Sequence, residues 1–269
     1  MAGDRYLLDN QQAMASERLD ALGALFDATT CRHLEMVGLA QGWRVWEVGA
    51  GGSRLPRWIA DQTNVPVLAT DIETALLNKR DPLLRVKTHD IGVDPAPREQ
   101  FDLIHARLVL VHVTRRAEAL QTMVEALAPG GWLVLEEADP GLQPLVCPDG
   151  TGAAQQLANQ LKAAFRTLMA ERGVDLAFGR TLPRLIREAG LLDVAADAYF
   201  PIGGPTCDEL ERTTIEQIRG QLIEAELATE DQIERHLANI SSGQLDLTTS
   251  PLISAWGRKP LGNEVRAAS

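Results

Sequence analysis

Cysteine and clustered basic residues are both scarce in this sequence, and each shortage argues against a class of protein. The chain has 269 residues and three cysteines, which lie far apart without a CxxC pair or histidine-rich neighbours. We therefore expect neither a disulfide framework nor a metal site. The formal net charge is −11 and no long run of Lys and Arg occurs. A large nucleic-acid interface is thus disfavoured, and a small molecule is the expected ligand.

Long apolar runs are also missing. The longest apolar stretch, residues 103–113, is interrupted by His105, Arg107 and His112. The N-terminus carries charged residues where a secretory signal needs an apolar region. The sequence therefore predicts no membrane segment and no membrane partner, and we expect a cytoplasmic protein. Its length allows one large domain or two small ones, and we expect a single domain with insertions.

A short apolar strand at residues 45–48 is the most informative segment. It carries one acid, Glu47, and is followed by the small residues Gly49-Ala50-Gly51-Gly52-Ser53. A helix is expected from Arg54 on, with Ser53 as its cap. Glycines at the end of a strand let backbone approach a ligand where a Cβ would collide. The pattern is typical of a site for a nucleotide-like ligand, and an ordinary strand-to-helix turn is the alternative.

A second acid follows at the spacing of a ribose-binding site. Residues 65–70 are expected to form a second strand that ends on Asp71, twenty residues beyond Gly51. Nucleotide-binding βαβ units place a carboxylate there to accept hydrogen bonds from ribose hydroxyls. An acid at a strand end can also simply cap the following helix, and that alternative stays open.

Strands and helices alternate along the rest of the chain. The further expected strands are 84–88, 101–107, 132–136, 194–200 and 252–257. This order predicts an α/β fold with a Rossmann-like, doubly wound, mostly parallel seven-stranded sheet. Ligands of such sheets bind at the carboxyl ends of the strands. The residues that fall there are Gly49, Asp71, Asp90, Arg107 and Glu136.

Helical segments are expected to flank this core and to cover a closed, mostly apolar pocket for a small molecule. The expected parts are a helical N-terminal lid or arm (1–40), the α/β core (41–139), a helical insertion (140–182), the C-terminal part of the sheet (183–260) with a helical cap at about 206–242, and a tail (261–269). Capping-box patterns at Thr206-x-x-Glu209 and Thr229-x-x-Gln232 predict the starts of the two cap helices. The opening Tyr6-Leu7-Leu8-Asp9-Asn10 could close over a ligand or be a frayed end.

Two nucleotide ligands fit a strand, turn and helix with a downstream acid: a dinucleotide such as NAD, and S-adenosylmethionine. The dinucleotide fingerprint requires Gly or Ala three residues after its second Gly, so that helix and strand pack closely. Arg54 occupies that position here. Glu47 would also repel a pyrophosphate while suiting a cationic amino-acid group. The residues therefore favour S-adenosylmethionine.

Five segments in order carry a family resemblance. Residues 45–52 match an acid-x-Gly-x-Gly signature, Asp71 matches a ribose-binding acid, and His89-Asp90-Ile91 resembles an adenine-side segment. Residues 101–112 and 127–133 look like the two later motifs. Together they resemble the class I S-adenosylmethionine-dependent methyltransferases over about residues 40–137. The surrounding pattern looks like bacterial small-molecule methyltransferases, including those of secondary-metabolite pathways.

The resemblance implies a role for each matched residue, with S-adenosyl-L-methionine as cofactor and S-adenosyl-L-homocysteine as product. The implied cofactor-binding residues are Glu47, Gly49, Ala50 and Gly51 along the methionine part, Asp71 on the ribose hydroxyls with Ile72 on the adenine, Asp90 and Ile91 at the adenine amine and ring, and Ala106 and Arg107 near the methionine end. For Arg107, an ion pair with a neighbouring acid is the alternative.

Methyl transfer needs an electrophilic sulfonium, an in-line nucleophile and sometimes a base, so alignment can supply much of the rate. His112 is the candidate base, because histidine titrates near neutral pH and this one follows the fourth strand on the ligand side. Its alternative is packing in the first turn of a helix. His105 is expected to be structural. Glu136, Glu137 and Asp139 could bind an acceptor cation, orient a hydroxyl, or be solvated loop acids.

The acceptor is expected to be a small molecule that is methylated on a hydroxyl in a natural-product pathway, with N- or C-methylation as alternatives. A protein that binds the cofactor without methyl transfer is a further alternative. We expect no nucleic-acid partner, and the surface helices offer faces for a homodimer.

Overall fold

The computed structural model describes residues 7–8, 15–262 and 264. Tyr6, Asp9 and Asn10 of the opening segment lie outside the described residues. The elements, in chain order, are α1 (Ala15–Met36), β1 (Val45–Val48), α2 (Arg54–Thr63), β2 (Val67–Asp71), β3 (Leu84–Thr88), β4 (Phe101–Arg107), the 3-10 helix η1 (Leu110–His112), α3 (Arg116–Ala126), β5 (Leu127–Ala138), α4 (Ala153–Glu171), the 3-10 helix η2 (Gly179–Thr181), α5 (Leu182–Glu188), β6 (Leu192–Tyr199), α6 (Pro205–Glu224), α7 (Glu230–Ser241) and β7 (Leu252–Arg258).

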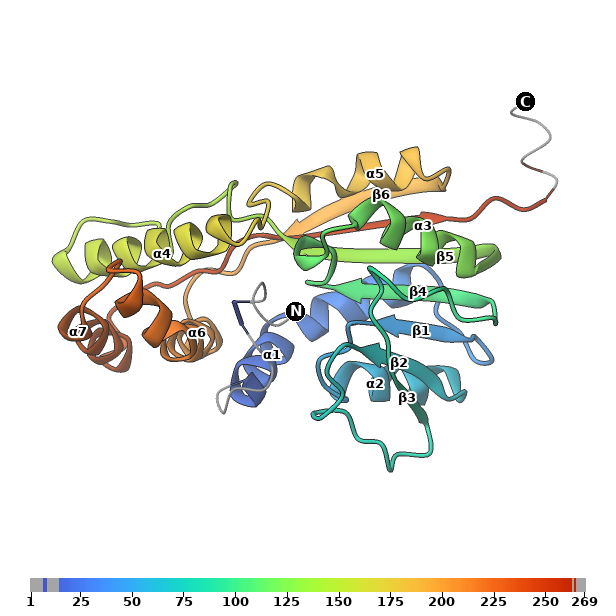
Figure 1. Cartoon of the computed structure of the whole chain (residues 1–269), viewed down its shortest axis with the longest axis horizontal. Helices are drawn as coiled ribbons and strands as arrows, with labels where there is room; N and C mark the ends of the chain where they lie inside the picture. Colours follow the sequence, from blue (N-terminus) through green and yellow to red (C-terminus); the bar gives the residue numbers. More distant parts are fainter. Residues whose placement is uncertain (1–6, 9–14, 263, 265–269) are drawn as a thin grey trace. The chain divides into compact units, whose positions relative to one another are not determined.

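The strands form one seven-stranded sheet in the order β3-β2-β1-β4-β5-β7-β6 (Figure 1). Neighbouring strands from β3 through β5 pair in parallel. The chain leaves β1 towards β3 on one side and returns to β4 on the other, so the strand order reverses between β1 and β4. Ligands of doubly wound sheets bind at such a reversal. The α/β, mostly parallel fold predicted from the sequence is confirmed.

The predicted strands agree with the observed ones to within a few residues except at β5. This strand runs from Leu127 to Ala138, whereas the sequence predicted 132–136. Leu127 pairs with Phe101 of β4, and the register shifts before the next pair, Leu103 with Trp132. The proline and glycines between Leu127 and Trp132 had indicated a loop, but they lie within an irregular part of the pairing.

The chain forms two compact units, which are described separately. The sheet unit comprises Asp27–Glu137, Phe178–Ala198 and the chain from Ile253 on; the helical unit comprises the chain up to Phe26, Ala138–Ala177 and Tyr199–Leu252. The division into five parts made from the sequence stays a prediction. Among the described residues, no helix combines the length and apolar character that crossing a membrane requires.

One apolar core of the sheet unit lies where α2 and the end of α1 pack on the sheet. Each strand from β1 to β5 contributes one buried residue, and in the parallel register Val45 lies opposite Leu103 and Val67 opposite Leu84. The buried members are Leu34, Val37, Val45, Leu55, Ile59, Ala60, Val67, Leu84, Leu103 and Val134. This packing fixes β1 and β2, and with them the residues that follow each strand.

The core of the helical unit joins α4, α6 and α7, which pack against one another (Figure 1). Its buried members include Leu157, Leu161, Ala164, Phe165 and Leu168 of α4, Ile215, Ile218 and Leu222 of α6, and Ile233 of α7. The residues on α4 recur at intervals of three or four, as one face of a helix requires.

The two capping-box predictions have different outcomes. At Thr229 the box is complete: the side chain of Thr229 accepts from the backbone of Gln232, whose side chain accepts from the backbone of Thr229. At Thr206 the prediction is wrong, because α6 begins one residue earlier, at Pro205, with Gly204 as its cap. A proline suits a first helical position, since it lacks the N–H that would otherwise be unpaired there.

Candidate functional site

The turn after β1 requires glycine for two separate reasons. Gly49 and Gly51 have φ angles of +64° and +61°, a region that side-chain-bearing residues rarely adopt. A Cβ on Gly49 would also lie 2.3 Å from Cγ2 of Val109. Ala50 donates from its backbone to Thr70 at 2.9 Å, which ties the turn to the end of β2. The turn therefore presents backbone, without side chains, at the point where the strand order reverses.

Asp71 is the last residue of β2, and its carboxylate contacts the glycine turn. One oxygen accepts from the backbone N–H of Gly51 at 2.8 Å and the other from that of Glu73 at 2.9 Å. Burial raises the pKa of Asp71, although the backbone hydrogen bonds oppose the shift. Each carboxylate oxygen can accept more than one hydrogen bond. Asp71 is therefore held at the turn with capacity left for hydroxyl donors.

Ile72 follows directly and is 60% exposed. A ligand with a flat ring and hydroxyl groups suits this arrangement. Its ring would cover the exposed apolar side chain, and its hydroxyls would bond to the neighbouring carboxylate. A glycine turn, an acid with acceptor capacity and an exposed apolar side chain fit the methionine, ribose and adenine parts of the cofactor expected from the sequence.

Asp90 and Ile91 follow β3. Asp90 is half-buried, and its Oδ1 accepts from the backbone N–H of Gly92 at 2.8 Å. Its backbone N–H donates to Asp94 at 2.8 Å. Ile91 is buried, with 6% of its surface exposed. Asp90 thus shapes its own loop, and the predicted contacts of both residues with adenine stay predictions.

Ala106 and Arg107 end β4, next to β1. Ala106 is buried and lies opposite Val48 in the parallel register. Arg107 donates to Asp27 at 2.8 Å and to the hydroxyl of Thr30 at 2.9 Å. The ion pair considered as the alternative for Arg107 is therefore present. Asp27 also pairs with Arg54, at 2.9 Å, so one carboxylate holds two arginines.

Glu47 does not stand alone inside β1, because its carboxylate meets His105 of β4. Nδ1 of His105 lies 2.8 and 2.9 Å from the two oxygens of Glu47. Its Nε2 lies 3.5 Å from Oε2 of Glu136, which is too long for a hydrogen bond. The imidazole of His105 is fully buried between the two carboxylates. These contacts agree with the structural role expected for His105.

Glu136 is the centre of this buried network. Its oxygens accept hydrogen bonds from Ser254 at 2.8 Å and from the hydroxyl of Thr30. Nδ1 of His33 lies 3.0 Å from Oε1 of Glu136, and Nε2 of His33 lies 3.0 Å from Asp197. Glu136 is completely buried. It is therefore neither a solvated loop acid nor an open site for an acceptor cation.

The buried network determines the charge of its members. Burial opposes a charged His105, but the negative charge of Glu47 and the carboxylate of Glu136 outweigh burial and raise its pKa to about 9. Burial would likewise raise the pKa of Glu136, but the nearby imidazoles of His105 and His33 lower it overall. The network therefore holds a histidine cation between carboxylates at neutral pH.

Glu137 holds the segment that follows β4. Its Oε1 accepts from the backbone N–H of Leu110 at 2.6 Å, of Val109 at 3.1 Å and of Val111 at 3.4 Å. Burial raises the pKa of Glu137 to about 8, although these hydrogen bonds oppose the shift. Leu108, at the start of the segment, has a φ of +58°, a strained value for leucine. Glu137 thus stabilises the strained turn that brings Val109 against Gly49.

His112, the candidate base, lies in η1 and is exposed. It does not pack in the first turn of an α-helix, because α3 begins only at Arg116. Asp139 is buried, and its Oδ1 accepts from the backbone N–H of Leu142 at 3.0 Å. Ser53 precedes α2 but makes no side-chain cap, since its hydroxyl accepts from the backbone of Asn78.

Sequence reasoning missed the roles of Thr30, His33 and Ser254, which complete the network around Glu136. These residues are separated from Glu136 by more than 100 positions along the chain. The available signal was the polar Ser254 within an apolar segment, which indicates a buried polar contact without naming its partner.

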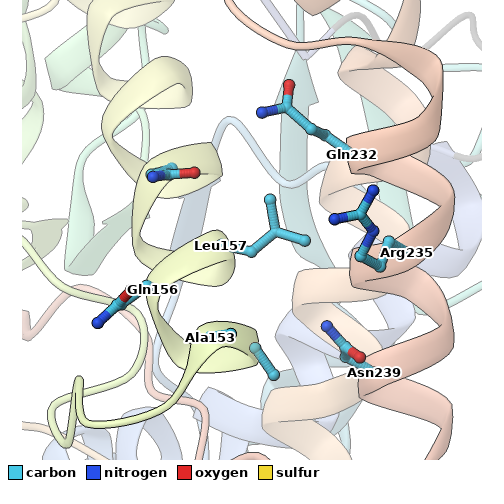
Figure 2. Close-up of a pocket in the computed structure, with 8 residues that line it drawn as sticks. Ala153, Gln156, Leu157, Gln232, Arg235 and Asn239 are labelled. Atoms are coloured by element: carbon cyan, nitrogen blue, oxygen red, sulfur yellow. The ribbon is translucent and has the colours of Figure 1, made fainter.

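A separate cleft of about 420 Å³ lies in the helical unit, between α4 and α7. Figure 2 shows Gln232, Arg235 and Asn239 of one helix facing Leu157 of the other. None of the residues predicted to bind the cofactor lines this cleft. Its amide side chains carry no titratable group that could act as a base.

The model of the methyltransferase domain family matches residues 46–133, the segment from β1 into β5. A curated relative, the methyltransferase str2 of Strobilurus tenacellus, is 30% identical over 168 residues, which cover 61% of this chain and 59% of that protein. Over this segment the chain matches the methyltransferase family, and its seven-stranded sheet is the Rossmann-like fold of methyltransferases. This family uses S-adenosylmethionine, and the five motifs read from the sequence lie within or beside the matched segment.

Two solved structures show how far the fold extends beyond that segment. Phosphoethanolamine N-methyltransferase 2 of Haemonchus contortus aligns with 95% of this chain and 60% of its own, with a TM-score of 0.58 and 15% identity. A protein described as a methyltransferase from an antibiotic biosynthesis pathway of Anabaena variabilis aligns over 86% and 96%, with a TM-score of 0.60 and 14% identity. The chain spans about 60% of the curated relatives str2 and str3.

Proposed function

We propose that this chain binds S-adenosyl-L-methionine in the sheet unit and transfers its methyl group to a hydroxyl of a small molecule in a natural-product pathway. The observation that carries the proposal is the contact between Asp71 and the backbone of Gly51, at adjacent strand ends on one side of the reversal in strand order. This contact joins a ribose-binding acid to a turn that a side chain would block.

The residues at this site have separate tasks in the proposed reaction. When bound, the cofactor supplies a methyl group on a positively charged sulfur. Asp71 accepts hydrogen bonds from ribose hydroxyls, Ile72 covers the adenine, and the Gly49 turn admits the methionine part. Glu47, with its carboxylate held by His105, adds negative charge near the cationic amino group. Asp90, Ile91, Ala106 and Arg107 complete the proposed binding set.

Methyl transfer breaks the bond between the methyl carbon and the sulfur and forms a bond between that carbon and the acceptor oxygen. The electron pair of the broken bond stays on sulfur, and the product is S-adenosyl-L-homocysteine. The acceptor proton must leave, and the exposed His112 is the group we propose to take it. Alignment of the two reactants supplies much of the rate, so a modest base suffices.

A hydroxyl is the proposed acceptor. A nitrogen acceptor is the alternative, because the name of the Haemonchus protein describes that protein as an N-methyltransferase. The natural-product assignment is supported by the description of the Anabaena protein. That helices of the helical unit cover the acceptor, that a homodimer forms, and that the protein is cytoplasmic and binds no nucleic acid all stay predictions of the sequence.

A labelled methyl group tests the proposal. The full chain is incubated with methyl-labelled S-adenosylmethionine and a panel of phenols, alcohols, amines and carboxylic acids. We expect label to appear in a hydroxyl compound and to depend on Asp71. Label found only in amines would replace O-methylation by N-methylation. Tight binding of the cofactor with no transfer to any compound would favour a protein that binds without methylating.

A further inference from the structure

The segment between β4 and α3 touches two separate parts of the proposed cofactor site, both within the sheet unit. Near its start, Val109 packs on the glycine turn, since a Cβ on Gly49 would lie 2.3 Å from Cγ2 of Val109. At its end, Val113 packs on the loop after β3, since a Cβ on Gly92 would lie 3.0 Å from Cγ1 of Val113. We call residues 108–113 the bridging segment, because they connect the turn expected at the methionine part with the loop expected at the adenine.

The bridging segment begins with a strained backbone. Leu108 has a φ of +58°, a value that residues with side chains rarely adopt. Such a conformation persists only where the surrounding structure holds it in place. The backbone N–H of Leu108 donates to the carbonyl oxygen of Glu136 at 2.8 Å, which fixes the first residue of the segment. The residues that follow need contacts of their own.

Glu137 of β5 binds the backbone donors of the bridging segment. Its Oε1 alone accepts from the N–H groups of Val109, Leu110 and Val111, at 3.1, 2.6 and 3.4 Å. The side chain is buried, and its Oε2 has no hydrogen-bond partner among the described residues. Burial raises the pKa of Glu137 to about 8, so the group is mainly neutral at pH 7. A neutral carboxyl oxygen, without a full negative charge, therefore holds three donors.

Arg116 of α3 binds the backbone acceptors of the same segment. Its Nε donates to the carbonyl oxygen of Leu110 at 3.1 Å, and its Nη2 donates to that of Val111 at 3.0 Å. The guanidinium also lies 5.0 Å from the centre of the Phe178 ring, a contact that restricts its orientation. Leu110 and Val111 are therefore held at both their N–H and their C=O groups, by side chains from two different elements.

This arrangement affects the site as well as the fold. The two residues held by Glu137 and Arg116 lie between Val109 and Val113, which pack on the glycine turn and on the loop after β3. A shift of the bridging segment would therefore change both of these contacts together. Glu137 and Arg116 can influence the cofactor site in this way without touching the cofactor.

We propose that Glu137 and Arg116 are positioning residues: by holding the bridging segment, they keep the glycine turn and the loop after β3 in the geometry that binds S-adenosyl-L-methionine. The inference rests on the proposed function and adds two residues that lie outside the proposed binding set. A protein whose binding geometry is only partly populated binds its ligand more weakly by that fraction. Loosening the segment should therefore weaken cofactor binding in molecules that stay folded.

Calorimetric titration of the full chain with S-adenosylhomocysteine at pH 7 compares three variants. Glu137→Ala removes the acceptor and should weaken binding about tenfold or more, because three backbone donors lose their partner. Glu137→Gln keeps a neutral side chain with one acceptor oxygen, as in the protonated carboxyl, and should keep the native affinity. Arg116→Met keeps an apolar stem but removes both donors, and should weaken binding about fivefold or more.

A variant that only destabilises the fold separates positioning from support. Ile186 of α5 is fully buried and packs on Gly257 of β7, a strand that β5 separates from β4. Ile186→Ala leaves a cavity and should lower the temperature of thermal unfolding. Its affinity for S-adenosylhomocysteine should stay native, since the cavity lies outside the bridging segment. Thermal unfolding of all four variants shows which of them are folded at the temperature of the titration.

The outcomes distinguish this inference from the proposed function. Native affinity in folded Glu137→Ala or in Arg116→Met would overturn the inference. Weakening by Glu137→Gln as large as that by Glu137→Ala would overturn it too, as would equal weakening by Ile186→Ala. If Glu137→Ala does not fold, the comparison of Arg116→Met with Ile186→Ala decides. Failure of the native chain to bind S-adenosylhomocysteine would instead overturn the proposed function.

Discussion

The sheet unit and the helical unit both bury charged side chains, but they satisfy them differently. In the sheet unit, Glu136 accepts hydrogen bonds from Thr30 and Ser254 and contacts His33 and His105. In the helical unit, Arg18 has one hydrogen bond, to an uncharged side chain. Glu136 thus has several polar partners within its unit, whereas Arg18 has one uncharged partner among the described residues.

The difference has a physical reason. A buried charge is strongly unfavourable unless paired, so charges that only support the fold are expected to have their partners within the fold. The network of the sheet unit lies beneath the turn that we propose binds the cofactor, and it fixes Glu47 through His105. The carboxylates of Glu47 and Glu136 follow this rule.

Glu136→Gln should have the largest effect, because it removes the charge at the centre of the buried network. The variant leaves a buried histidine cation with one carboxylate fewer, and we expect the free energy of unfolding to fall by about 3–5 kcal/mol. Urea unfolding measures it. Glu118→Gln, on an exposed residue of α3 in the same unit, is the control and should unfold like the native protein. Equal stability of the two variants would mean that the network does not support the fold.

Alkaline pH should weaken the same network. The pKa of His105 is about 9 in the folded chain and near 6.5 in the unfolded chain. Its stabilisation is therefore complete below pH 6.5 and is lost as the pH rises through 9. The loss is about 3 kcal/mol.

Glu137 also makes the folded chain less stable as the pH rises. Its pKa of about 8 exceeds the unfolded value near 4.5, so the folded chain holds a proton that the unfolded chain has released. Urea unfolding at several pH values should show stability falling between pH 6.5 and 9, less steeply in His105→Asn. Stability that rises over this window would contradict the assigned charges.

Gly49→Ala should have an intermediate effect and tests the backbone of the cofactor turn. The added methyl group meets Val109 and strains a positive φ, so we expect a loss of about 1–3 kcal/mol in stability. Gly52→Ala is the matched control: its Cβ meets nothing within 4 Å and its φ is not in the positive region, so stability should change by less than about 0.5 kcal/mol. Equal losses in thermal unfolding would show that the turn tolerates a side chain at both positions.

Thr229→Ala should have the smallest effect and falls in the helical unit. It removes the capping box of α7, which costs about 1 kcal/mol. Thr206→Ala changes the same residue type in the same sequence pattern, but no box forms there, so its stability should stay near the native value. Thermal unfolding of the two variants compares them directly, and a larger loss for Thr206→Ala would reverse the assignment.

The strands and the cofactor turn could be predicted because their signals are local. The run from Val45 to Gly51 and the acid at Asp71 indicate a strand, a turn and the end of a second strand by residue type and spacing alone. Their roles in cofactor binding stay predictions. Thr206 shows the limit of such signals, because the neighbouring Pro205 moved the start of the helix.

The contacts of Glu136 and Glu137 could not be predicted, because they depend on tertiary packing. Glu136 meets residues more than 100 positions away, and Glu137 meets backbone N–H groups that a strained turn at Leu108 exposes. Two adjacent acids near the end of β5 look alike in sequence, yet Glu136 contacts histidines and Glu137 accepts from backbone N–H groups. Only the three-dimensional arrangement separates them.

Calorimetric titration with S-adenosylhomocysteine tests the central claim, that the sheet unit binds this cofactor through Asp71. The native chain should bind one equivalent, and Asp71→Ala should weaken binding by roughly 10-fold to 150-fold, the loss of a hydrogen bond to a charged group. Asp61→Ala, which removes an exposed acid of α2 in the same unit, should bind like the native chain. Equal affinity of Asp71→Ala and the native chain, or no binding by the native chain, would contradict the account.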